Sequence, residues 1–364
     1  MAVPLPSTKE LILSTAWPDQ AFTVAHTEKG EPKIPDDLAA LKAIVQGSLS
    51  SFQSKLANDR PSNIVEAERT ISLGDGIESR IIVCHSQIPS KPSPLIVLYH
   101  GGGYCIAFPE AEVKFARQLA ITYSATVVCP SVRLAPEHPF PASINDGWAV
   151  LKYLAKEATS PHNSSNPILP AETDPTAGFI VGGTSSGANL ASVLAHLARD
   201  NALSPPLTGQ FLCAGGYIDQ NRVPEKYKPL YLSYDQNANA PLLTRDFLLM
   251  FRAALKPDPD SALWAPFDQH HSADAPGEVK EGHMGLPPAH FQICGMDLSR
   301  DDGLIYEKVL REECGVPTRV DLYAGYPHCW WNVYPDIERS KRREEDAVAA
   351  FGWLLSFGGG KKSV

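Results

Sequence analysis

The sequence predicts an α/β fold in which a mostly parallel central sheet is flanked by helices. Short apolar runs with the character of strands alternate with longer segments whose apolar residues recur at helical spacing. Such alternation is typical of parallel strands joined by helical crossovers. One run, Pro94 to Tyr99, is apolar throughout, which indicates a strand covered on both faces.

Length and composition favour a single domain over residues 1–364. The chain can bury a large core, and its 43% hydrophobic and 20% charged residues are ordinary for a globular protein. The net charge of -9 argues against nucleic acid and anionic membranes as partners, because both would repel an acidic surface. The expected partner is a small molecule, and a homodimer is left open.

Cysteine usage and the start of the chain point to a cytoplasmic protein. Seven cysteines form an odd set without clustered spacing, which favours free thiols packed as small hydrophobes over disulfides or a zinc site. The first residues lack a basic region followed by an apolar core, and no run is long enough to cross a bilayer. We therefore expect a cytoplasmic location, no membrane span, no metal and no cofactor.

The first part of the chain combines a helical segment with a hairpin. Residues 1–60 carry apolar residues at helical spacing after Pro35-Asp36-Asp37, which has the composition of a helix start. Two strand-like segments, 68–72 and 80–84, are separated by Gly74-Asp75-Gly76, which predicts a tight turn. After the strand at 94–99, the alternation continues with a helix at 107–124, a strand at 126–129 and a helix at 142–155.

A proline-rich loop, 131–141, lies between the last two of these elements. Its prolines indicate a rigid, irregular path. Within it, Arg133 and Glu137 have charges that could pair, and we expect them to brace the loop as an ion pair.

A glycine triplet follows the apolar strand directly, in His100-Gly101-Gly102-Gly103. Glycines allow bare backbone N–H groups to approach a ligand, and such donors can hold the oxyanion of an acyl-transfer intermediate. A flexible turn is the alternative. The position between a core strand and a helix favours the oxyanion site.

A second glycine-containing turn lies at residues 178–190. The apolar run Phe179-Ile180-Val181 ends in glycines, and helical spacing begins after Ser185. Gly183-x-Ser185-x-Gly187 is the pattern in which a serine on a sharp turn from strand to helix is exposed above a sheet. Glycines suit the flanking positions because a Cβ there would strike neighbouring backbone.

The alternation breaks from about 219 to 286 and then resumes. Aromatic residues stand among prolines in this segment, which indicates an inserted helical cap formed together with residues 1–60. We expect its aromatic side chains to lie mainly in the interior of the cap rather than along a substrate pocket. Around the segment, the pattern predicts strands at 211–217, 290–294 and 319–323 and helices at 302–314 and 342–355.

Two polar residues stand just past the ends of the last two predicted strands. Asp297 follows the strand at 290–294, and His328 follows the strand at 319–323. Ligands of open α/β sheets bind at the carboxyl ends of the strands. The chain order Ser185, Asp297, His328 therefore offers a nucleophile, a carboxylate and an imidazole at one edge of the sheet.

Together these motifs resemble the hormone-sensitive-lipase-like carboxylesterases of the α/β-hydrolase fold. The resemblance extends from about residue 78 to 355. It rests on the His100 to Gly103 segment, Arg133-Leu-Ala-Pro-Glu137 with Asp146, the Gly183 to Gly187 pentapeptide, and the separation of Asp297 from His328.

The resemblance implies a role for each site residue. Ser185 is the expected nucleophile, His328 the general base and then acid, and Asp297 the carboxylate that orients the imidazole. The backbone N–H groups of Gly102, Gly103 and Ser186 are the expected oxyanion hole, and no metal is required.

The chain departs from the family pattern at three places. Thr184 precedes the nucleophile where many relatives have aspartate. Asp301 and Asp302 lie close to Asp297, so they remain alternatives for the acid. Cys329-Trp330-Trp331 follows the histidine where glycine and phenylalanine are common, which leaves the pocket shape open.

Three functions are compatible with these residues. The first is hydrolysis of carboxylic esters with short or medium acyl groups, or of a compact natural product, through an acyl-enzyme. The second keeps the triad for a tailoring step of secondary metabolism, namely lactone or thioester hydrolysis or acyl transfer. The third is a non-catalytic small-molecule receptor, because plant gibberellin receptors have a similar pattern but lack the triad histidine.

Overall fold

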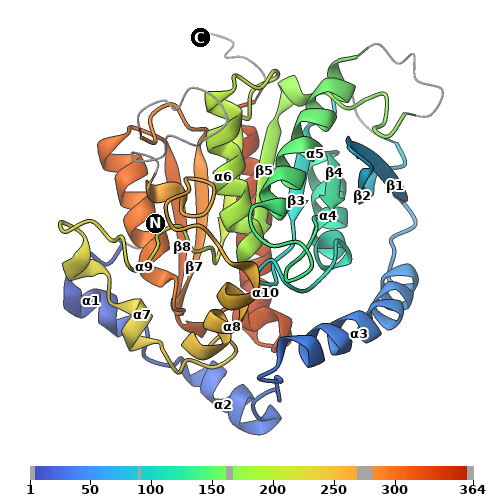
Figure 1. The fold of residues 1–364 in the computed structure, drawn as a ribbon. Helices are drawn as coiled ribbons and strands as arrows, with labels where there is room; N and C mark the ends of the chain where they lie inside the picture. Colours follow the sequence, from blue (N-terminus) through green and yellow to red (C-terminus); the bar gives the residue numbers. More distant parts are fainter. Residues whose placement is uncertain (1–4, 89–91, 161–166, 269–281, 359–364) are drawn as a thin grey trace.

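The computed structural model describes residues 5–88, 92–160, 167–268 and 282–358, and one eight-stranded sheet forms its centre (Figure 1). The first four strands are β1 (Ile64–Gly74), β2 (Ile77–Ser86), β3 (Leu95–Tyr99) and β4 (Thr126–Pro130). The others are β5 (Phe179–Thr184), β6 (Gly209–Cys213), β7 (Ala289–Met296) and β8 (Thr318–Pro327).

The strand order is β1-β2-β4-β3-β5-β6-β7-β8. β1 and β2 form an antiparallel hairpin at one edge, β2 is antiparallel to β4, and the remaining neighbours are parallel. Asp75 and Gly76 form the hairpin turn with φ of 51° and 72°, since a two-residue turn of this hand needs positive φ at both positions. The mostly parallel sheet expected from the sequence is confirmed.

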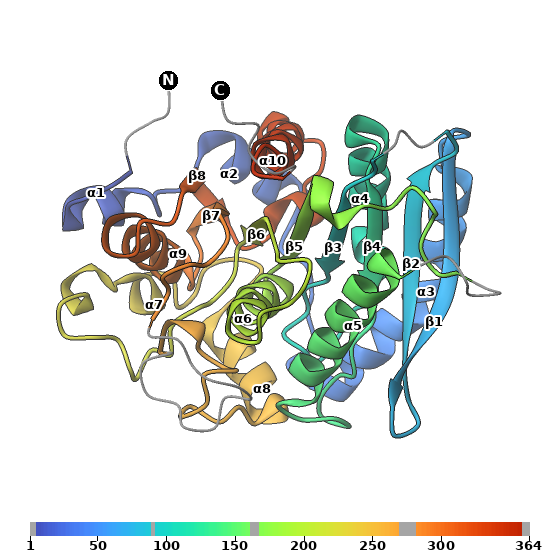
Figure 2. The ribbon, with the colours of Figure 1, turned by 90° about the horizontal axis from the view of Figure 1, so that it is seen from above.

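Helices cover both faces of the sheet (Figure 2). α4 (Glu110–Tyr123) and α10 (Glu338–Leu355) lie on one face, and α5 (Ala142–Thr159), α6 (Ser186–Asp200) and α9 (Arg300–Lys308) lie on the other. Alternate residues of β3 point into the two cores, because successive side chains of a strand face opposite ways. Val97 and Tyr99 belong to the core beneath α5 and α6, whereas Ile96 and Leu98 belong to the core beneath α4 and α10.

Further helices of the described chain are drawn below the sheet in Figure 1, where β5 ends. They are α1 (Lys9–Ser14), α2 (Gln20–Lys29), α3 (Leu38–Asn58), α7 (Ser233–Gln236) and α8 (Arg245–Leu255). The Asp37 carboxylate accepts the Ala40 N–H at 2.8 Å, so α3 begins where the sequence predicts. The single domain with a cap formed by 1–60 and 219–286 stays a prediction, and residues 269–281 of that cap lie outside the described residues.

Two local expectations are wrong. The strand expected at 211–217 ends at Cys213, because the Asp302 carboxylate accepts the N–H groups of Tyr217 and Ile218 at 3.0 and 2.8 Å in place of a neighbouring strand. The expected ion pair between Arg133 and Glu137 is absent: Arg133 pairs with Asp146 at 2.7 Å, and Glu137 pairs with Lys42 of α3.

The cysteines lie where the apolar runs place them. All seven are thiols, and Cys84, Cys129, Cys213 and Cys294 are buried in β2, β4, β6 and β7. None of the helices in the described part of the chain has both the length and the apolar character needed to cross a membrane.

A buried histidine of α6 should make stability depend on pH. His196 is 1% exposed, and its Nε2 lies 2.9 Å from His283 Nδ1. Burial first, and then the neighbouring His283, hold the pKa of His196 well below its usual 6.5. Below about pH 6.5, this histidine therefore binds a proton in the unfolded chain but not in the folded chain. The free energy of unfolding consequently decreases as pH falls.

Comparison with His196→Leu isolates this effect from other titrating groups. Between pH 7.5 and 5.5, wild type should lose about 1 kcal/mol more of its unfolding free energy than the variant does. Urea unfolding at three pH values measures the difference. The control is His138→Leu, which replaces an exposed histidine and should have the same pH dependence of unfolding free energy as wild type. If the difference in unfolding free energy between His196→Leu and wild type does not change with pH, the expectation is wrong.

Candidate active site

Ser185 stands on the sharp turn between β5 and α6. Its φ of 57° and ψ of -120° are strained for a side-chain-bearing residue. Its N–H donates to the Cys213 carbonyl at 2.8 Å, which fixes the turn to the end of β6. The hydroxyl is thereby held at the carboxyl end of the sheet.

Gly183 and Gly187 allow this turn because both touch backbone. A Cβ at Gly183 would lie 2.5 Å from the Gly187 carbonyl carbon and 2.5 Å from the Tyr99 oxygen. A Cβ at Gly187 would lie 2.1 Å from the same Tyr99 oxygen. The glycines on either side of Ser185 are therefore required by the close packing of α6 on β3, as the sequence pattern indicates.

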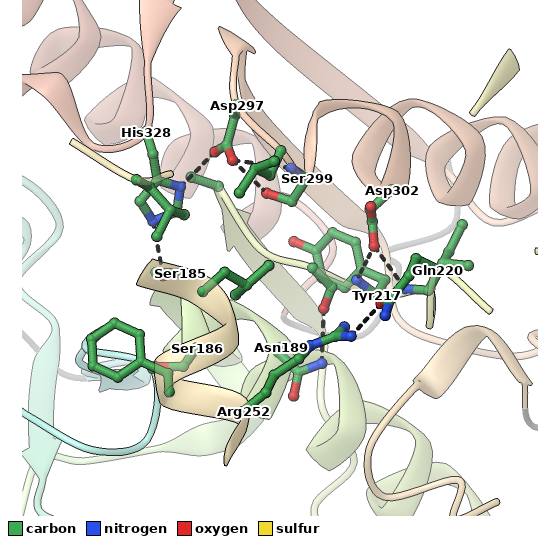
Figure 3. A pocket seen from close by; sticks show the side chains of 18 of the residues that line it. Ser185, Ser186, Asn189, Tyr217, Gln220, Arg252, Asp297, Ser299, Asp302 and His328 are labelled. Atoms are coloured by element: carbon green, nitrogen blue, oxygen red, sulfur yellow. Dashed lines mark hydrogen bonds and ion pairs between the residues drawn. The ribbon is translucent and has the colours of Figure 1, made fainter. Parts of the chain in front are cut away.

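The structure brings Ser185, His328 and Asp297 together (Figure 3). The Ser185 Oγ lies 2.9 Å from Nε2 of His328, and Nδ1 of His328 lies 2.5 Å from Oδ2 of Asp297. The arrangement matches an imidazole that donates from Nδ1 to the carboxylate and accepts the serine proton at Nε2. His328 follows β8 and Asp297 follows β7, so each reaches the site from the carboxyl end of its strand.

Asp297 is held for this contact, whereas its acidic neighbours are bound elsewhere. Its Oδ1 accepts the N–H and hydroxyl of Ser299, both at 3.0 Å, and its side chain is 1% exposed. Asp301 lies in a buried ion pair with Arg300 at 2.7 Å. Asp302 accepts backbone N–H groups, and burial raises its pKa to about 7.

The glycine loop lies against the serine turn. A Cβ at Gly101 would be 3.1 Å from the Ser185 Cβ, and the Tyr104 N–H donates to the Ser186 Oγ at 3.3 Å. Within the described residues, no group accepts a hydrogen bond from the N–H of Gly102, Gly103 or Ser186. The Nδ1 of His100 contacts the Gly101 carbonyl at 2.7 Å and ties the loop to the end of β3.

These residues open onto a pocket of about 120 Å³. Its wall consists mainly of apolar and aromatic side chains from the segment after β6: Ile218, Tyr231, Tyr234, Leu243, Leu248, Phe251, Leu255 and Trp264. The aromatic residues of this segment are expected to lie mainly in the interior, and this is correct only in part. Tyr227 and Phe267 are buried, but four other aromatic residues of the segment line the pocket.

In the part of the chain that the structure describes, no three His, Cys, Asp or Glu side chains are grouped so that they could hold a metal ion. The described site offers a serine hydroxyl, an imidazole, a carboxylate and backbone N–H donors.

Residues 96–332 match a protein family with the α/β-hydrolase fold. The chain belongs to this family. A carboxylesterase of Mycobacterium tuberculosis is 31% identical to it over 265 residues, which are 71% of the chain and 75% of the relative. A versiconal hemiacetal acetate esterase of Dothistroma septosporum is 27% identical over 324 residues, which are 88% of the chain and 89% of the relative.

Among solved structures, vibralactone cyclase is similar to the hydrolase with a TM-score of 0.82 and 26% identity, over 98% of this chain and 99% of that one. The predicted α/β-hydrolase fold and the resemblance to the hormone-sensitive-lipase-like carboxylesterases are thereby confirmed. The prediction that the chain is a hydrolytic enzyme is confirmed with them.

Sequence reasoning missed several polar residues that line the pocket of the hydrolase: Asn189, Gln220 and Arg252. Asn189 lies one helical turn after Ser185, and this spacing is a signal that could have identified it. Arg252 follows Phe251 in α8, whose apolar residues have helical spacing. Gln220 lies in an irregular stretch of the sequence that carries no such signal.

The tryptophan pair after His328 does not shape the pocket of the hydrolase. Trp330 is fully buried, with its ring centroid 4.6 Å from that of Tyr326. Trp331 lies against Arg343, whose guanidinium carbon is 4.0 Å from the ring centroid. The pair packs against residues of β8 and α10, and the pocket wall comes from other residues.

Gly103→Ala is expected to lower kcat about 10- to 100-fold, because it would displace the N–H that we expect to hold the oxyanion, and complete removal of such a donor costs roughly 100- to 1000-fold. The added Cβ would lie 2.6 Å from Cγ of Phe251, and φ of Gly103 is +61°. Both effects would shift the glycine loop. Steady-state hydrolysis of p-nitrophenyl butyrate measures the loss.

Gly30→Ala is the matched control, because Gly30 has a φ of +75° with open space around it. It should retain wild-type kcat. Gly103→Ala should lower kcat less when Phe251→Ala is already present than it does in wild type. The double variant is therefore compared with Phe251→Ala alone. Full activity of Gly103→Ala would show that the loop does not need its present conformation.

Proposed function

We propose that this hydrolase cleaves carboxylic esters through an acyl-enzyme on Ser185. The observation that carries the proposal is the continuous contact from the Ser185 Oγ to His328 Nε2 at 2.9 Å and from His328 Nδ1 to Asp297 at 2.5 Å. All three residues line the pocket. The similarity to two esterases supports the same activity.

The proposed reaction begins with His328 taking the Ser185 proton as the oxygen attacks the ester carbonyl carbon. Asp297 stabilises the imidazolium that forms and keeps Nε2 aimed at the serine. The imidazolium then protonates the leaving alcohol as the C–O bond breaks, which leaves an acyl-enzyme. Water, deprotonated by the same imidazole, attacks that ester and releases the acid.

Negative charge on the carbonyl oxygen would be stabilised by the N–H groups of Gly102, Gly103 and Ser186. These donors have no acceptor within the described residues, and Gly103 and Ser186 both line the pocket. Donors already in place need no reorganisation as the charge develops, which lowers the barrier.

The pocket supports short or medium acyl groups or a compact natural product as substrate. It encloses about 120 Å³ and is walled by side chains of α8 and the residues around it, which we assign to a cap. An apolar wall favours a substrate with modest hydrocarbon content. A cytoplasmic location and a homodimer are consistent with this proposal and stay predictions.

Hydrolysis of p-nitrophenyl esters from acetate to palmitate tests the proposal. We expect kcat/KM to be greatest at short or medium chains. Stopped-flow traces should show a burst of one nitrophenolate per active site for the esters whose deacylation is slower than their acylation, because the acyl-enzyme then accumulates. A folded protein that hydrolyses none of these esters would contradict it.

A second candidate is a tailoring reaction of secondary metabolism on the same three residues. The similarity to vibralactone cyclase over nearly the whole chain favours it. Incubation with lactones and with esters plus an added alcohol distinguishes the two, because preferential acyl transfer to the alcohol would favour the tailoring reaction. The receptor alternative has no support here, since His328 is present and contacts Ser185.

A further inference from the structure

The pocket contains a polar cluster apart from the proposed catalytic residues, formed by Arg252 and Gln220. Arg252 comes from α8 and Gln220 from the segment that follows β6, and both line the pocket. Figure 3 shows the two side chains directed toward one another, away from the contact between Ser185 and His328. The surrounding wall is largely apolar and aromatic.

The guanidinium of Arg252 is held in place from three sides. Its Nη1 donates to the Gln220 Oε1, and the same nitrogen lies 3.9 Å from an oxygen of Asp219. Its guanidinium carbon lies 5.3 Å from the ring centroid of Trp264. A group fixed in this way loses little conformational freedom when it binds a ligand.

Most donors of this cluster have no protein acceptor. A guanidinium carries five N–H groups, and in the described residues only Nη1 makes a hydrogen bond. Nε is fully buried and has no partner among the residues that the structure describes. The amide oxygen of Gln220 accepts the hydrogen bond from Arg252. The amide nitrogen of Gln220 donates to no described residue.

A purely structural role for Arg252 does not account for this arrangement. Asp219 is 4% exposed, and its carboxylate already accepts the Trp264 indole N–H at 3.1 Å and the Asn221 N–H at 2.9 Å. It is therefore satisfied without Arg252. The buried Nε is the donor that counts here, because a buried donor left unpaired is unfavourable unless a ligand supplies an acceptor.

We propose that Arg252 and Gln220 form a recognition site for a carbonyl oxygen of the substrate, remote from the ester that is cleaved. This inference rests on the proposed esterase function and specifies its substrate class as oxo-esters. A neutral acceptor fits better than a carboxylate, because Asp219 at 3.9 Å already balances the charge of Arg252. A plain hydrocarbon chain would leave the donors unpaired.

The test compares p-nitrophenyl octanoate with its 4-, 5-, 6- and 7-oxo analogues. A parallel series uses acetates of hydroxyoctanones, in which the ketone lies in the alcohol half of the ester. Wild type should prefer one oxo isomer over its hydrocarbon parent by about 10-fold or more in kcat/KM, since a site that binds an oxygen discriminates against the analogue lacking it.

Arg252→Met should reduce this preference ratio to about 1. The matched control is Arg245→Met, at the start of the same helix, where the arginine pairs with the largely exposed Asp235 and does not line the pocket. Arg245→Met should keep the wild-type ratio. Gln220→Leu should reduce the ratio, because it removes both an N–H donor and the anchor of Arg252.

Three results would overturn the proposal. They are an unchanged ratio in Arg252→Met, the absence of any oxo preference in both series of wild type, and a preference for the mono-p-nitrophenyl ester of octanedioic acid over every oxo isomer. If wild type hydrolyses no ester at all, the proposed function fails separately. Calorimetric titration of the methyl oxo-octanoates into Ser185→Ala, with and without Arg252→Met, then still measures whether Arg252 binds the ketone.

Discussion

Ser185→Ala is expected to lower kcat/KM for p-nitrophenyl butyrate by roughly 10⁴-fold or more. Without the hydroxyl, no acyl-enzyme can form, and only water activated by His328 remains as a nucleophile. The variant should keep the melting temperature of wild type, because within the described residues the lost Oγ makes a single hydrogen bond, to His328 at 2.9 Å. Rates and thermal unfolding measured on the same preparation separate catalysis from folding.

The control is Ser50→Ala, which removes an exposed hydroxyl of α3. It should behave as wild type in both measurements. A fluorophosphonate probe should add its mass to the peptide containing Ser185 in wild type and to none in Ser185→Ala. If Ser185→Ala retains more than a tenth of the activity, another nucleophile performs the reaction.

Asp297→Asn is expected to lower kcat by about 10⁴-fold with little change in KM. The amide NH₂ of asparagine can donate toward Nδ1 of His328, which favours the tautomer whose Nε2 carries a proton and cannot accept one from Ser185. The carboxylate that stabilises the imidazolium is also lost. Steady-state kinetics with p-nitrophenyl butyrate measures both parameters.

Asp301→Asn provides a matched comparison four residues away. Both oxygens of Asp301 are engaged in the fold, by Arg300 and by the N–H groups of Leu232 and Ser233. This substitution should lower the unfolding free energy by about 3 kcal/mol, because it disrupts a buried ion pair. Its kcat, measured where the variant is folded, should stay within a few-fold of wild type. A larger kcat loss in Asp301→Asn than in Asp297→Asn would move the acid to Asp301.

The sequence could predict the residues at the sheet edge because their positions follow from local rules. A strand, a glycine turn and a helix locate Ser185, and the residues after two strands locate Asp297 and His328. It could not choose among Asp297, Asp301 and Asp302, since three carboxylates lie within six positions. That choice depends on how the chain turns between β7 and α9, and on contacts with residues far away in the sequence.

The pocket wall could not be predicted for a different reason. Residues from 219 to 268 contain two short α-helices joined by irregular chain, and long-range contacts fix their course. The Asp301 carboxylate, for example, holds the N–H groups of Leu232 and Ser233, both at 2.6 Å. Such contacts leave no periodic pattern, so Gln220 carried no signal of a role in the site. The helical spacing around Arg252 indicates a helix but does not say which of its residues face the pocket.

The contact between Phe251 and Gly103 links the width of the pocket to the position of the glycine loop. The Phe251 ring forms part of the pocket wall, and it also rests on the glycine that is expected to hold the oxyanion. A substitution that widens the pocket at Phe251 therefore removes support from the glycine loop. Laboratory evolution of this enzyme toward bulkier esters should begin at Leu243 and Leu248, which line the same pocket and are not among the nearest neighbours of the loop glycines, so that a gain in substrate range does not cost turnover.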